Sequence, residues 1–166
     1  MNRRLKEKYG VDYIYHFTDT KNVDKIQEIG LYPRNMLDDD SYTPGGNEWS
    51  IDADNMFGLD SYVHCCFLPN HPMEYLARKE GRIIPIWLKI NAEILSKPKI
   101  RYTPGVSNRS DMNFYDNEEA KKNLDLLPLY EYLDWKIPEN GERRRDAEKY
   151  EILLPFIIPP NYIEVY

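Results

Sequence analysis

The stretch YVHCCFLPNHPMEYLA, residues 62–77, passes from an apolar run into the start of a helix. Residues 62–68 are predicted to form a strand, because a short apolar run bounded by turn-forming residues is typical of one. Asn70 or His71 stands where a helix cap is expected, and Pro72 follows in the first turn, where proline is tolerated. The same stretch holds both cysteines and two of the three histidines of the chain, so its chemistry decides the kind of protein.

The two cysteines are adjacent, and this argues against a metal site. Successive side chains of a strand point to opposite faces, so His64 and Cys66 share one face while Cys65 takes the other. Zinc sites are often marked by Cys-x-x-Cys or His-Glu-x-x-His spacings, and neither occurs in the sequence. A cysteine nucleophile needs a nearby base such as His16, His64 or His71, but cysteines in an apolar strand favour inert packing. We therefore expect neither a metal nor a catalytic thiol, and His64 is expected to face the core or the wall of a cleft.

The composition indicates one globular domain. The chain has 166 residues, 42% of them hydrophobic and 30% charged, which suffices for a single core. No apolar run approaches the roughly 20 residues that span a bilayer, and the charged start lacks the apolar segment of a signal peptide. Adjacent cysteines do not form an ordinary disulfide with each other. We expect a cytoplasmic protein with no membrane partner.

The charge pattern bears on nucleic-acid binding. A net charge of −6 argues against binding driven by the overall charge. The basic residues are nevertheless clustered, and such clusters either hold phosphates locally or form solvated faces. They lie at 2–8, 77–82, 97–101 and 142–149.

Short strands and helices are predicted in a mixed order, which favours an α+β fold over a doubly wound sheet. Two long polar loops, 36–60 and 101–117, interrupt them, and loops of such length are often functional. Strands are expected at 11–17, 62–68 and 82–90, the last buried on both faces, and within 150–166. Helices are expected at 19–30, 70–81, 117–127 and 143–149.

Three groups of motifs follow one another along the chain. They are Tyr-His-Phe-Thr at 15–18 with Gly-Leu at 30–31 and Arg-Asn at 34–35; Val-His-Cys-Cys-Phe-Leu-Pro-Asn-His-Pro-Met at 63–73; and Asp-Trp at 134–135 with the arginines 143–145, Glu-Ile-Leu-Leu-Pro at 151–155 and Pro-Asn-Tyr-Ile at 160–163. In this order and spacing they resemble the DarT family (DUF4433) of NAD-dependent ADP-ribosyltransferase toxins. The resemblance covers nearly the whole chain.

The resemblance implies both a fold and a reaction. The expected fold is a single ADP-ribosyltransferase-like domain over residues 1–166, with a mixed or antiparallel sheet split around an NAD cleft and short flanking helices. The implied reaction transfers ADP-ribose from NAD to a nucleobase, in single-stranded DNA or RNA, and releases nicotinamide without a metal. An unpaired base is the accessible acceptor, because pairing hides its ring nitrogens. A cognate antitoxin is the further partner that the resemblance implies.

The resemblance also assigns residues to the site. The catalytic glutamate of the family falls on Glu151 by the register of its Glu-Ile-Leu-Leu-Pro motif, with Glu148 as the alternative. A carboxylate beside the ribose 2′-hydroxyl would stabilise the oxocarbenium-like transition state. His16, together with the backbone groups of Phe17 and Thr18, is expected to contact NAD.

One departure from the family pattern concerns Asn70. It stands where the family has an arginine that contacts NAD and is thought to help at the target base, and asparagine lacks the charge and forked donors of arginine. We expect Asn70 at both the NAD and the catalytic site, with His71 or Arg34 as a substitute for the missing charge. Arg34 and Phe67 are also expected to contact NAD, and Phe67 or Tyr75 is the ring expected to stack on the flat nicotinamide. The loop 36–60 is expected to cover bound NAD as a lid.

Two other hypotheses remain open at the level of sequence. The asparagine and the negative net charge would suit a degenerate member that binds NAD or nucleic acid without catalysis. The 14 tyrosines would suit a small protein-interaction domain with a tyrosine-rich interface. The acceptor is also open among thymine, guanine, RNA and protein.

Overall fold

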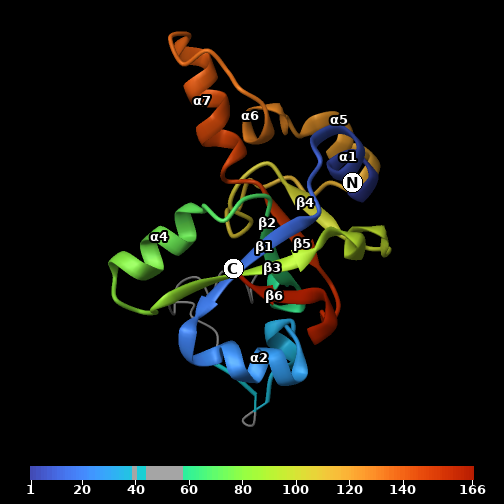
Figure 1. The fold of residues 1–166 in the computed structure, drawn as a ribbon, viewed down its shortest axis with the longest axis vertical. Helices are drawn as coiled ribbons and strands as arrows, with labels where there is room; N and C mark the ends of the chain where they lie inside the picture. The colour runs from blue at the N-terminus through green and yellow to red at the C-terminus, as the bar shows by residue number, and fades with distance from the viewer. Residues whose placement is uncertain (39–40, 44–57) are drawn as a thin grey trace.

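The structure, a computed structural model, describes residues 1–38, 41–43 and 58–166. Its centre is a six-stranded sheet with the order β4-β5-β2-β1-β3-β6, in which every neighbouring pair is antiparallel (Figure 1). The expected α+β fold is confirmed. The strands are β1 Tyr13–Asp19, β2 Val63–Cys66, β3 Pro85–Asn91, β4 Arg101–Thr103, β5 Glu151–Leu154 and β6 Ile163–Val165.

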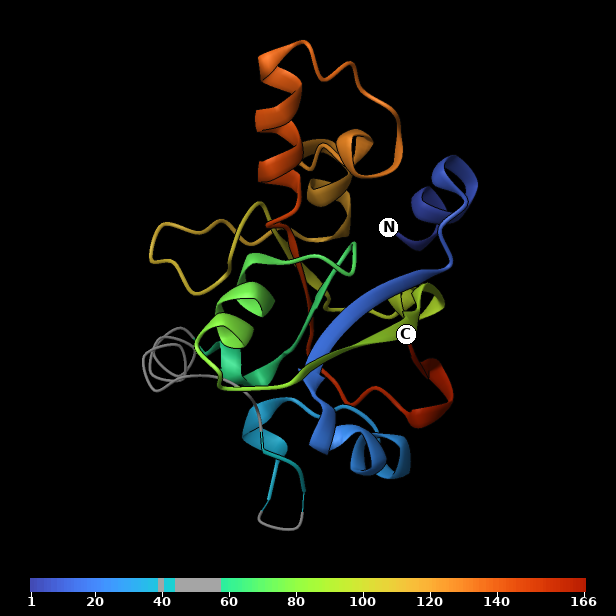
Figure 2. The ribbon, with the colours of Figure 1, turned by 60° about the vertical axis from the view of Figure 1, so that its left-hand side comes forward.

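Short helices flank this sheet. Helices α5, α6 and α7 gather beyond one end of it, and α2 lies beyond the other (Figures 1 and 2). In the described part of the chain, no helix is both long and apolar enough to cross a membrane. The helices are α1 Asn2–Tyr9, α2 Val23–Ile29, α4 Pro72–Lys79, α5 Asn117–Asn123, α6 Leu127–Tyr130 and α7 Pro138–Ala147, and the 3-10 turns are η1 Thr20–Asn22, η2 Arg34–Met36, η3 Leu59–Ser61, η4 Ala92–Ser96 and η5 Pro160–Tyr162.

The helix that follows β2 begins where the sequence predicts. The ring of His71 caps α4, since its Nδ1 accepts a hydrogen bond of 3.4 Å from the backbone N–H of Met73, and Pro72 is the first helical residue. Helix α7 also begins at a proline, Pro138, five residues before the predicted start at Arg143. Proline suits the first turn of a helix because no acceptor is needed there for its missing N–H.

The sheet is split between β1 and β2. These strands share one residue pair, Tyr15 with Cys66, whereas β1 pairs with β3 along its whole length. Strand β2 instead pairs with β5 through all four of its residues. The two halves of the sheet therefore diverge beyond Tyr15, as expected for a sheet split around a cleft.

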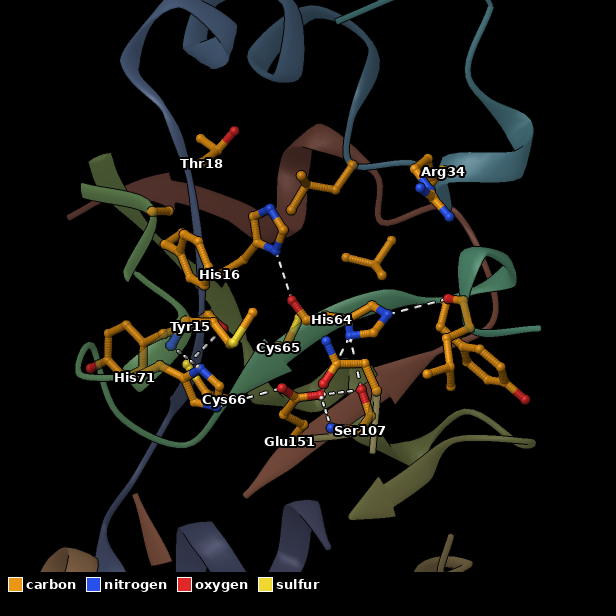
Figure 3. Close-up of a pocket in the computed structure, with 18 of the residues that line it drawn as sticks. Tyr15, His16, Thr18, Arg34, His64, Cys65, Cys66, His71, Ser107 and Glu151 are labelled. Atoms are coloured by element: carbon orange, nitrogen blue, oxygen red, sulfur yellow. Dashed lines mark hydrogen bonds and ion pairs between the residues drawn. The ribbon is translucent and has the colours of Figure 1, made fainter. Parts of the chain in front are cut away.

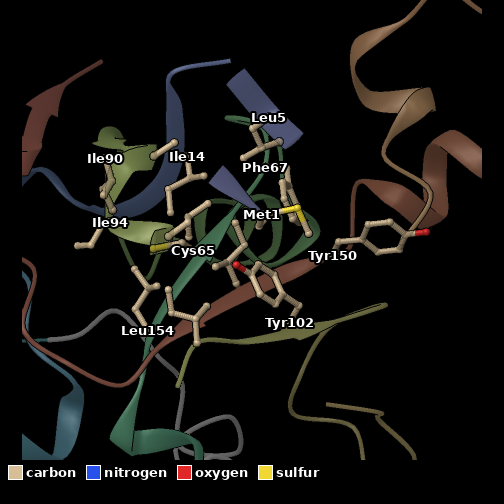
Figure 4. Close-up of a cluster of buried hydrophobic side chains, with 14 of the residues drawn as sticks. Met1, Leu5, Ile14, Cys65, Phe67, Ile90, Ile94, Tyr102, Tyr150 and Leu154 are labelled. Carbon is tan, nitrogen blue, oxygen red and sulfur yellow. The ribbon is translucent and has the colours of Figure 1, made fainter. Parts of the chain in front are cut away.

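One face of the sheet carries the hydrophobic core. Ile14, Cys65 and Leu154 point to this face from three neighbouring strands, and Leu5 of α1 and Ile94 of η4 pack over it (Figure 4). Alternation along the strands sends the intervening residues to the opposite face. Both cysteine side chains are buried, as expected, but only Cys65 belongs to this core.

The prediction of a strand at 82–90 buried on both faces is wrong in two respects. Strand β3 begins at Pro85, and Ile84 before it is 74% exposed. Within the strand Leu88 is fully buried, whereas Trp87 is only half-buried. A central strand with one covered face needs apolar residues only at every second position.

Gly30 connects α2 to the segment that borders the split. Its φ is +94°, and a Cβ there would lie 2.3 Å from the carbonyl oxygen of Ile158. Leu31, the next residue, pairs with Ile158 through hydrogen bonds of 2.8 and 2.9 Å. Only glycine combines this backbone conformation with so close an approach.

Gly30→Ala is expected to lower the free energy of unfolding by about 2 kcal/mol or more, because it adds a backbone clash to the strain of a positive φ. Gly10→Ala is the matched control: its φ is +65°, and no atom lies within 4 Å of the added Cβ. This control pays the conformational cost alone, roughly 1 kcal/mol. Urea denaturation of both variants measures the difference, and equal losses would contradict the close-approach argument.

Candidate active site at the split of the sheet

A pocket opens where β1 and β2 diverge (Figure 3). Its walls come from β1, the segment around η2, η3 with β2, α4 with residues 82–83 that follow it, the segment after β4, and the first residue of β5. The lining residues used below are Tyr15, His16, Phe17, Thr18, Arg34, His64, Cys65, Cys66, His71, Ser107 and Glu151.

Glu151 is the first residue of β5, and with Asp60 of η3 it is one of two carboxylates among the described residues that line the pocket. It stands opposite Cys66 on β2 and Thr103 on β4, so its side chain points to the face of the sheet that does not carry the core. The side chain is 5% exposed. A buried carboxylate requires hydrogen bonds and opposite charge to remain ionised.

Both oxygens of Glu151 have polar neighbours, but of different kinds. Oε2 accepts hydrogen bonds from the hydroxyl and the backbone N–H of Ser107, at 2.5 and 3.2 Å, and lies 3.4 Å from Nδ1 of His64. Oε1 faces Nε2 of His71 at 3.6 Å, which is longer than a hydrogen bond. One oxygen is thus held firmly, while the other is left for a further partner.

The charge of Glu151 follows from these neighbours. Burial by itself favours the neutral acid, but the hydrogen bond and charge of His64, the charge of His71 and the hydroxyl of Ser107 outweigh it and leave the pKa of the carboxyl below its ordinary value. Glu151 is therefore a carboxylate at neutral pH.

His16 presents a neutral ring to the pocket. Its Nδ1 lies 2.7 Å from the carbonyl oxygen of His64, so Nδ1 donates and carries the proton. Burial lowers the pKa of the ring to about 4, although the bond to the His64 carbonyl opposes the shift. In the neutral ring Nε2 is then an acceptor, suited to a ligand hydroxyl or amide.

The two remaining histidines complete the surroundings of the carboxylate. His64 directs Nε2 to the carbonyl oxygen of Leu59 at 3.2 Å and Nδ1 towards Ser107 and Glu151, so both ring nitrogens face oxygens. His71 uses Nδ1 as the cap acceptor of α4, which leaves Nε2 to carry the proton of the neutral ring. Burial lowers the pKa of His71, and the charge of Glu151 and the backbone of Lys149 partly oppose this.

The two cysteines border the pocket without reactive character. Burial raises the pKa of both thiols well above the ordinary value, with a further contribution from the negative charge of Glu151. The Cys66 thiol donates to the carbonyl oxygens of Leu68 and Tyr15, at 3.1 and 3.5 Å. Among the described residues, no group of three or more His, Cys, Asp or Glu side chains is arranged to hold a metal ion.

Most residues expected at the site line this pocket. His16, Phe17 and Thr18 come from β1, and Arg34 lies on η2 across the opening (Figure 3). The alternative glutamate, Glu148, is elsewhere: it caps the end of α7 and pairs with Arg144, Oε1 to Nε at 2.7 Å.

Two expected residues do not reach the pocket. Phe67 continues the alternation of Cys65 on β2, so it points into the hydrophobic core and is 1% exposed (Figure 4). Asn70 is exposed beside the cap of α4 and is absent from the pocket wall. Tyr75, the other aromatic considered for stacking on nicotinamide, is 52% exposed on α4 and also lies outside the wall. The expected lid, 36–60, falls largely on 39–40 and 44–57, outside the described residues.

Two residues of the site were not among those expected. His64 was predicted to share a face with Cys66 and to face the core or the wall of a cleft, but it was not assigned to the site; strand alternation was the available signal for its position. Ser107 lies in the polar loop after β4, 44 residues before Glu151, and no local pattern marks it.

Comparison with known proteins defines the class. The sequence matches the family model described as "ssDNA thymidine ADP-ribosyltransferase, DarT" over residues 15–165, and no curated protein sequence matches the chain significantly. The protein is thus an NAD-dependent ADP-ribosyltransferase. Within this class, the chain belongs to the DarT family.

The fold is shared with solved members of that family. The structure of Thermus sp. 2.9 DarT in complex with ADP-ribosylated ssDNA has a TM-score of 0.68 at 21% identity, covering 93% of this chain and 81% of that one. The same protein in complex with NAD+ has a TM-score of 0.61 at 21% identity, with 92% and 79% covered. Thermosipho africanus DarTG in complex with ADP-ribose has 0.62 at 20% identity, with 93% and 43% covered. At these identities the likeness shows the fold.

The neutral state of His16 predicts a pH dependence of stability. Unfolded His16 takes up a proton near pH 6.5, whereas the folded ring does so only near pH 4. The unfolded state thus binds more protons between these values, so stability is complete above pH 6.5 and falls as the pH decreases towards 4.

His16→Asn, which keeps an N–H donor for the His64 carbonyl, is expected to remove this contribution. From pH 7 to pH 5 the wild type should lose on the order of 1 kcal/mol more unfolding free energy than the variant, a modest figure because the ring borders the open pocket. Urea titrations at both pH values measure it. His71, whose pKa is shifted in the same direction, is present in both proteins and cancels; parallel losses would contradict a neutral His16.

Proposed function

We propose that this protein transfers ADP-ribose from NAD+ to a base of single-stranded DNA, with Glu151 as the catalytic carboxylate. The observation that carries the proposal is the pocket at the split of the sheet, which the Glu151 carboxylate shares with the neutral ring of His16. Thymine is the first acceptor to test, because the family model describes thymidine transferases. In this proposal His16, Phe17, Thr18 and Arg34 line the space that NAD+ occupies.

The reaction breaks the bond between the nicotinamide nitrogen and ribose C1″. The electron pair leaves with nicotinamide, positive charge develops on the ribose, and a ring nitrogen of the base then bonds to C1″ and loses its proton. A carboxylate beside the 2″-hydroxyl stabilises that charge most when it is fixed in advance and shielded from water. Glu151 meets both conditions, because Ser107 holds its Oε2 in place and the residue is nearly buried.

In this proposal the two oxygens of Glu151 have different roles. Oε2 is occupied by Ser107 and lies beside His64, so it orients the carboxylate. Among the described residues, the polar contact of Oε1 is with His71 at 3.6 Å, so Oε1 is the oxygen available to the ribose hydroxyl. The carboxylate also serves as acceptor for the proton that the base releases. His64 and Ser107 are then positioning residues.

Among the residues of the site, His71 is the best candidate to replace the arginine that the family has at position 70. Its ring is buried and faces Oε1, whereas the neighbouring Asn70 is exposed. We propose that the N–H of His71 limits the orientation of Oε1, a role that a hydrogen-bond donor fills without the permanent charge of arginine.

The proposal includes a cellular setting. A transferase that modifies DNA bases damages the cell that makes it, which supports a cognate antitoxin as partner. The cytoplasm, where NAD and transiently unpaired DNA meet, is the expected location.

Glu151→Gln is expected to reduce nicotinamide release and the mass gain on a thymine-containing oligonucleotide by at least about 100-fold, since the charge is lost while the shape is kept. Mass spectrometry of the oligonucleotide after incubation with NAD+ measures the transfer. NAD+ should still raise the melting temperature of the variant, because binding energy comes from the rest of the pocket. Glu148→Gln, outside the pocket, is the matched control and should retain activity.

An NAD+-stabilised wild type that transfers nothing to DNA, RNA or protein would contradict the proposed reaction and favour a binding module. A wild type that NAD+ does not stabilise would favour a protein-interaction domain instead.

Ser107→Ala is expected to lower kcat roughly 10- to 100-fold, with little change in the KM for NAD+, because Glu151 loses its orientation and not its charge. It should also move the acid limb of kcat to higher pH, since the hydroxyl of Ser107 helps to keep the pKa of Glu151 low. Ser96→Ala, which removes an exposed hydroxyl on η4, is the control. A merely structural role for Ser107 would leave the acid limb in place.

A further inference from the structure

The register of the sheet connects Glu151 to a row of side chains that the proposed reaction does not use. Glu151 stands opposite Cys66, Cys66 opposite Tyr15, Tyr15 opposite Lys89, and Lys89 opposite Glu164. Residues directly opposite one another on neighbouring strands point to the same face. The catalytic carboxylate therefore shares one face of the sheet with residues on β1, β3 and β6, which lie side by side (Figure 1).

Aromatic rings cover this part of the face. Phe17 and Trp87 are opposite each other, with ring centroids 5.5 Å apart, and Tyr15 and Tyr166 meet edge to face at 5.6 Å. The backbone N–H of Tyr166 bonds to the carbonyl oxygen of Trp87 at 2.9 Å, which continues the register beyond β6. We call the set Tyr13, Tyr15, Phe17, Trp87, Lys89 and Tyr166 the aromatic face.

Lys89 lies within these rings. Its ammonium nitrogen is 4.7 Å from the ring centroid of Tyr166 and 5.5 Å from that of Tyr13. The hydroxyl of Tyr13 donates to Glu164 at 3.3 Å, so one acidic residue borders the same area. Lys89 and Glu164 together have no net charge, and the surface is dominated by flat rings.

The aromatic face is not a second core. The opposite face of the same strands holds Ile14, Leu88 and Ile90, all fully buried, whereas the rings of the aromatic face keep part of their surface exposed and Tyr166 is 60% exposed. Leaving four large rings half-buried and a fifth exposed forfeits part of the stabilisation that full burial would bring. A surface of this kind is typical of a binding site.

We propose that the aromatic face binds the nucleotides that flank the target base of a single-stranded acceptor, a proposal that rests on the proposed function. Bases of an unpaired strand stack on aromatic side chains, and stacking tolerates any sequence because every base has a flat face. Tyr15 belongs both to this face and to the wall of the pocket that Glu151 lines, so a strand lying across β6, β3 and β1 reaches the edge of that pocket. Strands are spaced by roughly 4.8 Å, so the row from Glu151 to Glu164 spans about 20 Å, enough for several nucleotides.

This surface also accounts for single-strand binding by an acidic protein. A net charge of −6 gives no general attraction for phosphates. Stacking requires none, and Lys89 supplies one cation among the rings. A protein partner on the same face would not need the contact with the pocket. A nucleic-acid strand does need it, because its target base must reach Glu151.

The test compares two double variants with the wild type, none of which alters the pocket wall. Tyr13→Ala/Tyr166→Ala removes two rings, and Tyr13→Phe/Tyr166→Phe keeps both rings without the hydroxyls. Tyr132→Ala removes a ring that is 84% exposed in the connection between α6 and α7 and is the matched control. Fluorescence anisotropy gives the Kd for a thymine-containing oligonucleotide of about 12 nucleotides, a length within the known range of single-strand platforms. A thymidine trinucleotide is the short competitor, and thermal denaturation verifies folding.

The alanine double variant is expected to weaken binding of the longer oligonucleotide about tenfold or more, and to raise its KM accordingly, while the trinucleotide and the KM for NAD+ are unaffected. The phenylalanine double variant and Tyr132→Ala should bind like the wild type. Unchanged Kd and KM for the longer oligonucleotide in the folded alanine variant would overturn the proposal and leave a protein partner as the occupant. If the wild type binds DNA but consumes no NAD+, the proposed reaction fails, and the Kd comparison still decides the role of the aromatic face.

Discussion

The burial of one carboxylate is the constraint on which the site depends. Removing the charge of Glu151 from water costs free energy, and hydrogen-bond donors and ring N–H groups close to its two oxygens offset part of that cost. Three separate parts of the chain supply them: Ser107 from the loop after β4, His64 from β2 and His71 from the cap of α4. The same contacts that keep the carboxylate ionised also fix its orientation, so the stability and the chemistry of the site have one physical origin.

The sheet separates the hydrophobic core from the site, because side chains along each strand point alternately to its two faces. One face packs against α1 and η4 and holds the apolar residues of five strands. The other carries Glu151, His64 and the aromatic face, where partial exposure is retained. The single pair between Tyr15 and Cys66 allows the halves of the sheet to diverge, and His16, which follows this pair, reaches the pocket through the opening.

The departure from the family pattern, asparagine in place of arginine at position 70, leaves His71 as the neighbour of the Glu151 carboxylate. An arginine at position 70 would bring permanent charge and a fork of donors, whereas this chain has an exposed asparagine there and a buried histidine next to it. His71 has a structural reason to be where it is, because its Nδ1 caps α4. The cap fixes the tautomer of the ring and thereby directs the N–H of Nε2 towards Glu151.

Local patterns in the sequence determined the strand that contains His16 and Phe17 and the helix that starts at Pro72. These follow from short-range chemistry, since period-2 alternation, capping and proline act over a few residues. The expectation of a split sheet and the assignment of Glu151 came instead from the resemblance of the motifs to the family. The tertiary structure alone decided which side chains meet. Ser107 and His64 reach Glu151 across 44 and 87 residues, and the row from Glu151 to Glu164 exists only in the register of five strands. Phe67 and Asn70 show the converse error: the motif assigned them to the site, but their side chains do not point into the pocket. A motif identifies residues without showing the face of the sheet to which each one points. Strand pairing sets that face, and pairing between distant segments is a property of the folded chain.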